Sequence, residues 1–223
     1  MKTKIPFIPY QTINYTEEET IKRSHDYYQY MDKRRTVRTF STKKVPQQVI
    51  DNIIMTAGTA PSGAHKQPWM FCVITKDEMR KTIRIAAEKE EYENYHGRMT
   101  EEWLADLTVF ETDWNKPFIE NASHIIVVFK KTYDINQEGG KNKNYYVNES
   151  VGIATGFLLA AIHNAGLVAL THTPSPMNFL GKILNRPNNE RPFLLIPVGY
   201  PAENTTVPNL NRKPKETIIA YYK

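Results

Sequence analysis

The chain has 223 residues, of which 40% are hydrophobic and 24% charged, and it carries a formal net charge of +5 at pH 7. These proportions are those of a globular domain and exclude collagen-like, disordered and coiled-coil sequences. Lys and Arg alternate with acidic residues and form no single basic block, which argues against a nucleic-acid-binding protein. We therefore expect one domain of mixed class spanning residues 1–223.

Cysteine usage and hydropathy set the expected compartment. Cys72 is the single cysteine, so an intramolecular disulfide is impossible, and no Cys/His cluster has the spacing of a structural zinc site. The first ten residues contain Pro6 and Pro9 and do not resemble a signal peptide. No run reaches the roughly 18 apolar residues that suggest a membrane span. The sequence predicts a soluble, cytoplasmic protein with no metal and no membrane association.

The first half of the chain begins with a proline-marked N-terminal arm, residues 1–15. Thr16 and Glu19 form a predicted capping box for a helix over 17–33, after which residues 36–40 are extended. A second helix is expected to have Pro46 in its first turn, because apolar residues follow at helical spacing. These are Val49, Ile50, Ile53, Ile54 and Ala57.

A shaped loop is expected over 60–69, where two prolines and a glycine fall within ten residues, followed by a strand over 70–75. Thr75 and Glu78 predict a second capping box, opening a helix whose apolar positions are Met79, Ile83 and Ile85. Residues 91–116 are polar, rich in aromatics and without a strong period. This composition suits a mobile substrate lid.

The second half is predicted to hold an apolar strand over 125–129, a Gly/Lys/Asn loop over 136–144 that we expect to be irregular or disordered, and a long helix over 146–165. Small residues in that helix permit close approach of another helix, which suits a dimer core, and Gly166 closes it. Strands over 167–171 and 193–198 flank a short helix. The tail, 201–223, is expected to wrap a partner subunit. Together these elements indicate an α+β layered domain.

Four separated segments carry a family resemblance. They are Arg34-Arg35-Thr36-Val37-Arg38, Pro61-Ser62-Gly63-Ala64-His65 with Pro68-Trp69, Thr171-His172-Thr173-Pro174, and Pro197-Val198-Gly199-Tyr200-Pro201. In this order and spacing, over residues 30–215, the chain resembles the nitroreductase superfamily. The resemblance implies an α+β sandwich that forms an intertwined homodimer and binds FMN at the subunit interface.

The cofactor residues follow from that resemblance. It implies that arginines hold the FMN phosphate, for which the planar guanidinium fork is well suited, and that loop residues line the flavin. An alternative for the arginine run alone is a cationic helix C-terminus, worth only tenths of a kcal/mol. The implied cofactor-binding residues are Arg34, Arg35, Thr36, Arg38, Pro61, Ser62, Gly63, Thr171, His172, Thr173 and Arg212.

Within the superfamily, residues 91–116 resemble the lid of the iodotyrosine deiodinases. The resemblance implies that Glu91, Tyr95 and Lys116 clamp the amino-acid end of a halotyrosine. A zwitterion needs an anion for its ammonium group and a cation with a hydroxyl donor for its carboxylate. The alternative is that Glu91 belongs to a solvated acidic run and Lys116 to a loop surface.

The implied reaction is FMN-dependent reductive dehalogenation of 3-iodo-L-tyrosine or diiodotyrosine to tyrosine and halide. The Ala64 N–H is expected to bind the substrate's phenolate oxygen, and the Thr173 hydroxyl to contact flavin N5 as the catalytic group. An external reductant, either NAD(P)H or a reductase, is required. Two alternatives stay open: a broad-specificity FMN nitroreductase or quinone reductase, and a non-enzymatic basic binding module.

Several other residues invite functional readings. His65, in the flavin loop, is either a general base or a loop-packing residue. Cys72 and Trp69 are expected to pack, because Cys72 lies in an apolar strand without a cationic pattern that would activate its thiolate. The same packing role is expected for the His172 side chain.

Overall fold

A computed structural model describes residues 5–223 of the chain. It divides into two compact units, residues 1–34 and 35–223, which are described separately. The first contains α1 (Glu17–Asp32), which begins where the Thr16 hydroxyl accepts a hydrogen bond from the Glu19 N–H at 3.2 Å. The Glu19 carboxylate pairs with Arg23 one turn later, so only the Thr16 half of the expected capping box is seen. None of the α1 residues is buried within this structure.

The second unit is built on an antiparallel sheet with strand order β1-β2-β6-β5. The strands are β1 (Trp69–Ile74), β2 (His124–Lys131), β6 (Glu190–Gly199) and β5 (Val168–Ala169). The central strand β2 is apolar on both sides because both faces of the sheet are covered. Its register places Val127 opposite Leu195 of β6 and Cys72 of β1. The predicted strands are therefore confirmed, with bounds that differ by a few residues.

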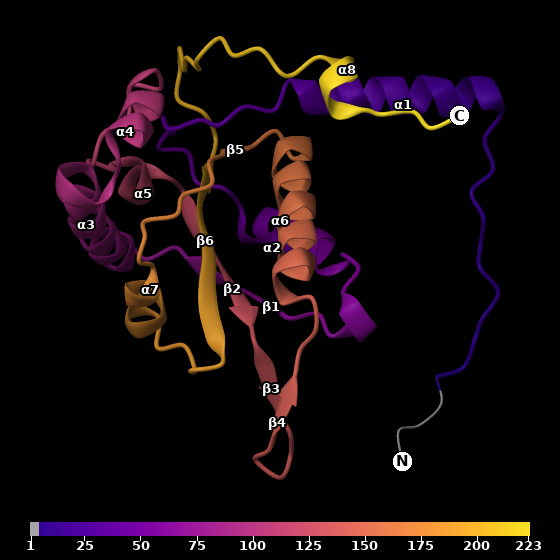
Figure 1. The fold of residues 1–223 in the computed structure, drawn as a ribbon, viewed down its shortest axis with the longest axis horizontal. Helices are drawn as coiled ribbons and strands as arrows, with labels where there is room; N and C mark the ends of the chain where they lie inside the picture. The colour runs from indigo at the N-terminus through magenta and orange to yellow at the C-terminus, as the bar shows by residue number, and fades with distance from the viewer. Residues whose placement is uncertain (1–4) are drawn as a thin grey trace. The chain divides into compact units, whose positions relative to one another are not determined.

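Helices cover the two faces of this sheet (Figure 1). On one face, α2 (Gln47–Gly58) and α6 (Val147–Asn164) pack their buried residues against Ile126 and Val128 of β2. On the other face, α3 (Asp77–Glu93), α5 (Phe118–Asn121) and α7 (Asn178–Ile183) pack against Ile125, Val127 and Phe129. Successive β2 side chains alternate between two cores, as a pleated strand requires. The expected α+β sandwich is confirmed.

The sequence prediction for the start of α3 is wrong. No capping box forms at Thr75 and Glu78: α3 has Lys76 as its N-cap with no side-chain cap, and Asp77 pairs with Arg80 instead. Of the apolar residues of this helix, Ile83 lies on the buried face, whereas Ile85 is 60% exposed.

Residues 136–144 are also not an irregular or disordered loop. They belong to a hairpin in which β3 (Tyr133–Ile135) pairs with β4 (Lys141–Lys143). The Asn136 carboxamide accepts hydrogen bonds from the N–H groups of Glu138 and Gly140, which holds the turn, and Gly139 has a φ of +78°. A polar side chain thus replaces apolar packing as the organiser of this hairpin. Figure 1 shows the hairpin projecting beyond the sheet.

The predicted lid, residues 91–116, is built of helical segments. It contains the last turn of α3, a π-helical turn η2 (Asn94–Arg98) and α4 (Glu101–Thr108), whose N-cap Thr100 accepts from the Trp103 N–H. The C-terminal tail is irregular apart from α8 (Lys215–Ile218). Among residues 5–223, no helix combines the length and the apolar composition that crossing a bilayer requires.

Candidate active site

The centre of the candidate site is a buried ion pair. Glu91, in the last turn of α3, and Lys116, just before α5, lie 3.4 Å apart, and their side chains are only 7% and 4% exposed. Burial raises the pKa of Glu91 and lowers that of Lys116, and each charge partly offsets the effect on the other. The alternative reading, in which both residues are solvated at the surface, is wrong.

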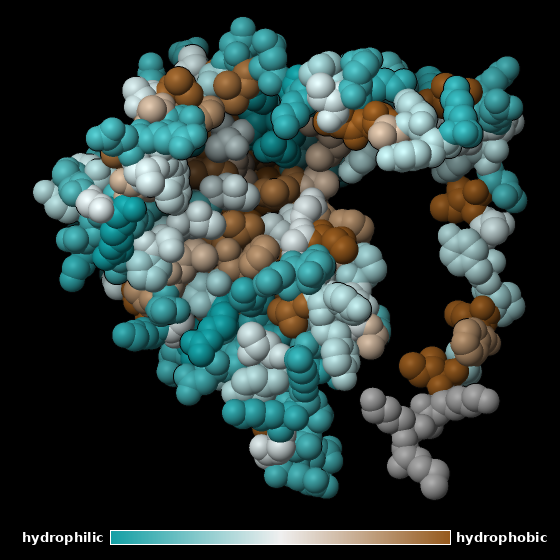
Figure 2. Space-filling model, viewed as in Figure 1, coloured by the Kyte–Doolittle hydropathy of each residue, from teal (hydrophilic) through white to brown (hydrophobic). Residues whose placement is uncertain are grey.

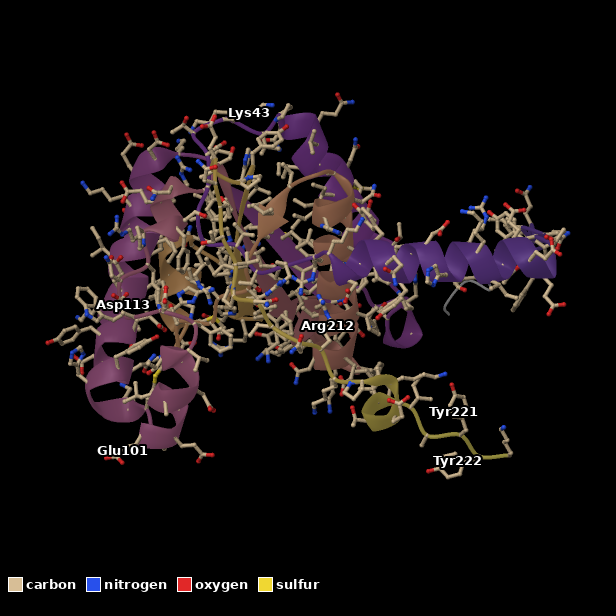
Figure 3. All side chains as sticks on the ribbon, turned by 90° about the horizontal axis from the view of Figure 1, so that it is seen from above. Lys43, Glu101, Asp113, Arg212, Tyr221 and Tyr222 are labelled. Atoms are coloured by element: carbon tan, nitrogen blue, oxygen red, sulfur yellow. The ribbon has the colours of Figure 1, made fainter. Side chains whose placement is uncertain are left out.

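Further hydrogen bonds hold the ammonium group of Lys116. It donates to the Thr112 hydroxyl at 3.3 Å and to the Asp113 carbonyl. Tyr95 also contacts this segment, since its hydroxyl donates to the Thr112 carbonyl at 3.2 Å and its ring centroid lies 5.2 Å from the Lys116 Nζ. Figure 3 shows Asp113 on the same side of the molecule as Glu101 of the lid. The structure thus brings the three predicted clamp residues together.

Asn94 is a site residue that sequence reasoning missed. It is buried at the start of η2, interacts with the Glu91 carboxylate, and donates from its side chain to the Ser175 carbonyl at 2.9 Å. The bond joins the lid to the segment that follows Thr173. A π-helical turn often marks a functional position in a helix, so η2 identifies Asn94 as a candidate in the structure. The sequence alone does not reveal such a turn.

The arginine run enters the second unit at Arg35 and lies beside β5. Thr36 forms a parallel bridge with Ala169, and the Val37 N–H donates to the Ala169 carbonyl at 3.2 Å. The Arg35 guanidinium donates to the Pro208 carbonyl in the tail. This pairing places the run next to the chain that continues from β5 into Thr171–Thr173. Arg34 belongs to the first unit, and the fully exposed segment around Arg212 follows Pro208 in the tail (Figure 3).

Arg38 faces both the clamp and a cavity. Its guanidinium is half-buried, which lowers its pKa, and it lies within electrostatic range of Tyr95, Lys116 and His172. A cavity of about 360 Å³ opens beside it. The lining residues are Thr36, Arg38, Thr39, Val109, Phe110, Glu111, Thr206, Val207 and Pro208. The walls of this cavity therefore come from the arginine run, the lid and the tail, and Arg38 and Glu111 are its charged lining residues.

His172 lies behind the Thr171–Thr173 segment. Its backbone pairs with Leu195 in both directions, and its ring meets Phe118 edge-on at a centroid distance of 5.6 Å. Burial, followed by the nearby cations Lys116 and Arg38, lowers the pKa of His172 to about 3. The imidazole is therefore neutral at physiological pH and packs, as expected. Thr171 and Thr173, on either side of it, are exposed.

The loop Pro61–Ala64 has a strained shape. Ala64 and His65 have φ values of +50° and +53°, in the left-handed region that most residues avoid. The Ser62 hydroxyl accepts from the Gln67 N–H at 2.9 Å, which fixes the turn. A Cβ at Gly63 would lie 3.2 Å from the Tyr145 carbonyl oxygen, so a glycine permits this close approach. His65 lies 2.9 Å from the Gln67 side chain through its ring nitrogen, which favours the loop-packing reading.

The two halves of the predicted cofactor site lie at opposite ends of α6. The Gly63 N–H donates to the Ser150 hydroxyl near the start of this helix, whereas the arginine run pairs with Ala169 just after its end. At 1.5 Å per residue, the helix from Ser150 to Ala165 spans about 22 Å. Figure 1 likewise shows β5 and the loop before β1 at different ends of α6. One chain therefore does not bring Pro61–Ala64 to Arg35–Arg38.

The fold and these residues can be compared with known proteins. The model of the nitroreductase family matches residues 31–200. The chain belongs to the nitroreductase family. An iodotyrosine deiodinase of Haliscomenobacter hydrossis is 63% identical over 222 residues, covering all of both chains. Human iodotyrosine deiodinase 1 is 44% identical over 96% of this chain and 75% of its own length.

Solved nitroreductase-family structures include a deiodinase with ligands. The crystal structure of oxidized iodotyrosine deiodinase bound to FMN and 3-iodo-L-tyrosine superposes with a TM-score of 0.74 at 30% identity, over 88% of this chain and 99% of that one. Within the family, this chain therefore groups with the iodotyrosine deiodinases in both sequence and fold. Among residues 5–223, no group of three or more His, Cys, Asp or Glu side chains has the arrangement of a metal site.

Proposed function

We propose that this chain is an FMN-dependent enzyme that reductively dehalogenates halotyrosines such as 3-iodo-L-tyrosine to tyrosine and halide. The observation that carries the proposal is the buried pair of Glu91 and Lys116 beside Tyr95, in a chain 63% identical to an iodotyrosine deiodinase over its full length. A buried pair of opposite charges offers partners for both ends of a zwitterion, and interactions between ionised groups strengthen where water is excluded.

The clamp residues would exchange partners when substrate binds. Glu91 would receive the substrate ammonium group, and Lys116 with the Tyr95 hydroxyl would receive the carboxylate. An uncharged phenol would leave the Glu91–Lys116 pair intact and gain neither bond. The clamp therefore selects amino acids over simple phenols, because a site built for charged partners discriminates strongly against ligands that lack them.

The residues of the second unit fit an FMN. Arg35 and Arg38 would supply cations for its phosphate and for an electron-rich ring, and the packing of Gly63 against Tyr145 holds the loop that would line the flavin. Arg34, Thr36 and Arg212 are proposed to join the phosphate contacts, and Pro61, Ser62, Thr171 and His172 the flavin surroundings. When bound, FMN supplies the electrons for the reduction.

Two groups are proposed to act at the reacting atoms. The Ala64 N–H, presented by a left-handed backbone, would donate to the phenolate oxygen and keep the substrate ring oriented. The exposed Thr173 hydroxyl would donate to flavin N5. His172 would support Thr173 from behind, because its ring is packed against Phe118 and its backbone is paired with Leu195.

A homodimer is part of the proposal, because it would bring the Pro61–Ala64 loop of one subunit to the arginine run of the other. The outer face of α6 suits such an interface. Ile153 and Phe157 are 43% and 41% exposed there, and the positions of Gly152 and Gly156 meet no other atoms within 4 Å. Apolar side chains flanking glycines allow close helix packing. We further propose a single domain, 1–223, with an N-terminal arm 1–15, a substrate lid 91–116 and a tail 201–223 that wraps the partner subunit.

The proposal also includes a cytoplasmic location and an external reductant, either NAD(P)H or a reductase. The test is a titration of the FMN-loaded protein with 3-iodo-L-tyrosine, followed by flavin absorbance, and then anaerobic turnover with dithionite while iodide is measured. We expect a saturable change in flavin absorbance during the titration and one iodide released for each tyrosine formed. Binding without iodide release would reject the enzymatic function, and nitroarene reduction without halotyrosine turnover would favour a general nitroreductase.

A further inference from the structure

The reaction proposed above needs electrons from outside the chain. Breaking the aryl carbon–halogen bond and forming a carbon–hydrogen bond consumes two electrons and one proton for each halide released. A surface where a donor docks should therefore lie close to the residues that line the flavin. One end of the second unit has the required position and charge.

Cations gather at the end of the sheet from which the hairpin β3–β4 projects. Lys130 of β2 stands directly opposite Arg191 of β6 in the sheet register. Like charges directly opposite each other destabilise a sheet, so this pair lowers the free energy of unfolding. Lys141 and Lys143 continue the positive charge along one face of β4, because residues two apart on a strand point the same way.

A second cavity extends this positive surface. It has a volume of about 370 Å³, and its walls include Lys182 and Arg191. Arg186 also lies there, but Glu190 neutralises it through two hydrogen bonds of 2.7 and 3.0 Å. In the described chain, residues 5–223, five cations of this region form no ion pair. We call them the cationic end: Lys130, Lys141, Lys143, Lys182 and Arg191.

The cationic end adjoins the loop that we assign to the flavin. The Lys131 N–H donates to the Pro68 carbonyl at 2.8 Å, directly after that loop. On its other side, Gly63 packs against Tyr145 and Tyr146, which follow Lys143 by two and three residues. The hairpin and the flavin loop thus form one continuous surface. Figure 2 shows a mainly hydrophilic surface over β3 and β4.

We propose that the cationic end is the docking surface for an acidic one-electron carrier protein that reduces the enzyme; this inference rests on the proposed function. Two reduced carriers would be oxidised for each halide released, with the proton taken from solvent. The cations are spread over β2, β4, β6 and α7, and Lys141 and Lys143 are exposed on a projecting hairpin. Such a spread suits a protein surface better than a small anion, and complementary charge raises association rates by 10–1000-fold.

The experiment compares electron donors and charge variants of the FMN-loaded full chain. The donors are an acidic flavodoxin and an acidic ferredoxin, each reduced beforehand, and dithionite as the small-molecule reference. The test variant is Lys141→Glu/Lys143→Glu. One control, Lys141→Arg/Lys143→Arg, keeps the charge. A second, Lys76→Glu/Lys81→Glu, makes the same charge change on two exposed residues, the N-cap of α3 and a residue of its second turn. Binding of each carrier is also measured by titration at low and high salt.

We expect Lys141→Glu/Lys143→Glu to weaken carrier binding and to reduce carrier-supported iodide release by about tenfold or more at low salt. Turnover with dithionite and binding of 3-iodo-L-tyrosine should be unchanged, as should both controls. Loss of dithionite turnover in the unmodified protein would count against the proposed function and not against this surface. The inference is overturned if neither carrier binds or supports turnover, if Lys76→Glu/Lys81→Glu has the same effect, or if Lys141→Glu/Lys143→Glu leaves carrier binding and carrier-supported turnover unchanged.

Discussion

The clamp and the cofactor half of the candidate site are organised in opposite ways. Glu91, Tyr95 and Lys116 meet within one chain, and the two charges neutralise each other there. The residues assigned to FMN are divided between the two ends of α6, so a single chain offers only part of that site. Under the proposed function, recognition of the zwitterion would therefore be built into one subunit, whereas FMN binding would depend on association of two subunits. Each of the following changes should affect one of these two regions and leave the other intact.

The largest effect is expected from breaking the clamp pair on one side. Lys116→Met leaves the Glu91 carboxylate buried without its cation, and removing one partner of a buried ion pair costs about 3–5 kcal/mol. The double variant Glu91→Gln/Lys116→Met has no unpaired charge and should recover most of that free energy of unfolding. Urea denaturation measures both values.

Turnover separates the clamp's stability role from its binding role. Both variants should lose kcat/KM for 3-iodo-L-tyrosine by at least about 100-fold, since hydrogen bonds to charged groups contribute about 1.5–3 kcal/mol each. FMN binding should be unchanged. If the double variant regained turnover together with stability, the clamp would not be the zwitterion site.

The cofactor half should be sensitive to the outer face of α6. Gly156→Glu adds a charge where a Cβ meets nothing within 4 Å, and a helix accepts Glu better than Gly by about 0.5–1 kcal/mol. The subunit should therefore stay folded while the dimer dissociates. We expect sedimentation to show a monomer. The Kd for FMN should rise on the order of 100-fold, because the cofactor would lose roughly three hydrogen bonds from the partner subunit. Ile85→Glu, at an exposed position of α3, is the control and should leave both unchanged.

A smaller effect is expected at the proposed redox contact. Thr173→Ala removes one hydroxyl from an exposed position and should slow iodide release about tenfold, the value of a single hydrogen bond of about 1.4 kcal/mol. FMN and 3-iodo-L-tyrosine should still bind as before, which titration of flavin absorbance measures. An unchanged rate in the variant would remove Thr173 from the mechanism.

The regular elements could be predicted because their patterns are local. The continuous apolar run of β2 indicates a strand buried on both faces. In the same way, helical spacing identifies the buried face of α2 through Ile50, Ile53 and Ala57. The helix that became α6 was identified with bounds within one residue, since Gly166 closes it with a φ of +71°. The clamp was predicted through a resemblance, and its burial is consistent with that reading.

What the sequence did not reveal depends on contacts between distant segments or on single side chains. Asn94 becomes a site residue through Ser175, 81 residues later, and no local pattern announces that bond. The β3–β4 hairpin was not predicted because the Asn136 carboxamide organises its turn. Its strands are also too short and polar to show alternating apolar and polar residues. The separation of Gly63 from Arg38 is a property of the fold. The order of the two segments along the chain does not say how far apart they lie in space.

The smallest predicted effect tests whether the His172 imidazole is buried and neutral beside the clamp cation. Burial and the cations Lys116 and Arg38 hold the pKa of His172 at about 3, below the 6.5 expected in an unfolded chain. The unfolded chain therefore takes up this proton first as the pH falls. Stability from a neutral His172 is fully present above pH 6.5 and is lost progressively as the pH drops toward 3.

Between pH 6.5 and 5.5 this group alone should lower the free energy of unfolding by about 1 kcal/mol. His172→Gln keeps a polar side chain of similar size without a titrating ring, so its stability should fall less over that interval by about this amount. Urea denaturation at the two pH values measures the difference. Equal slopes in the unaltered protein and in His172→Gln would mean that the pKa of this imidazole is not lowered in the folded protein and that water reaches the ring.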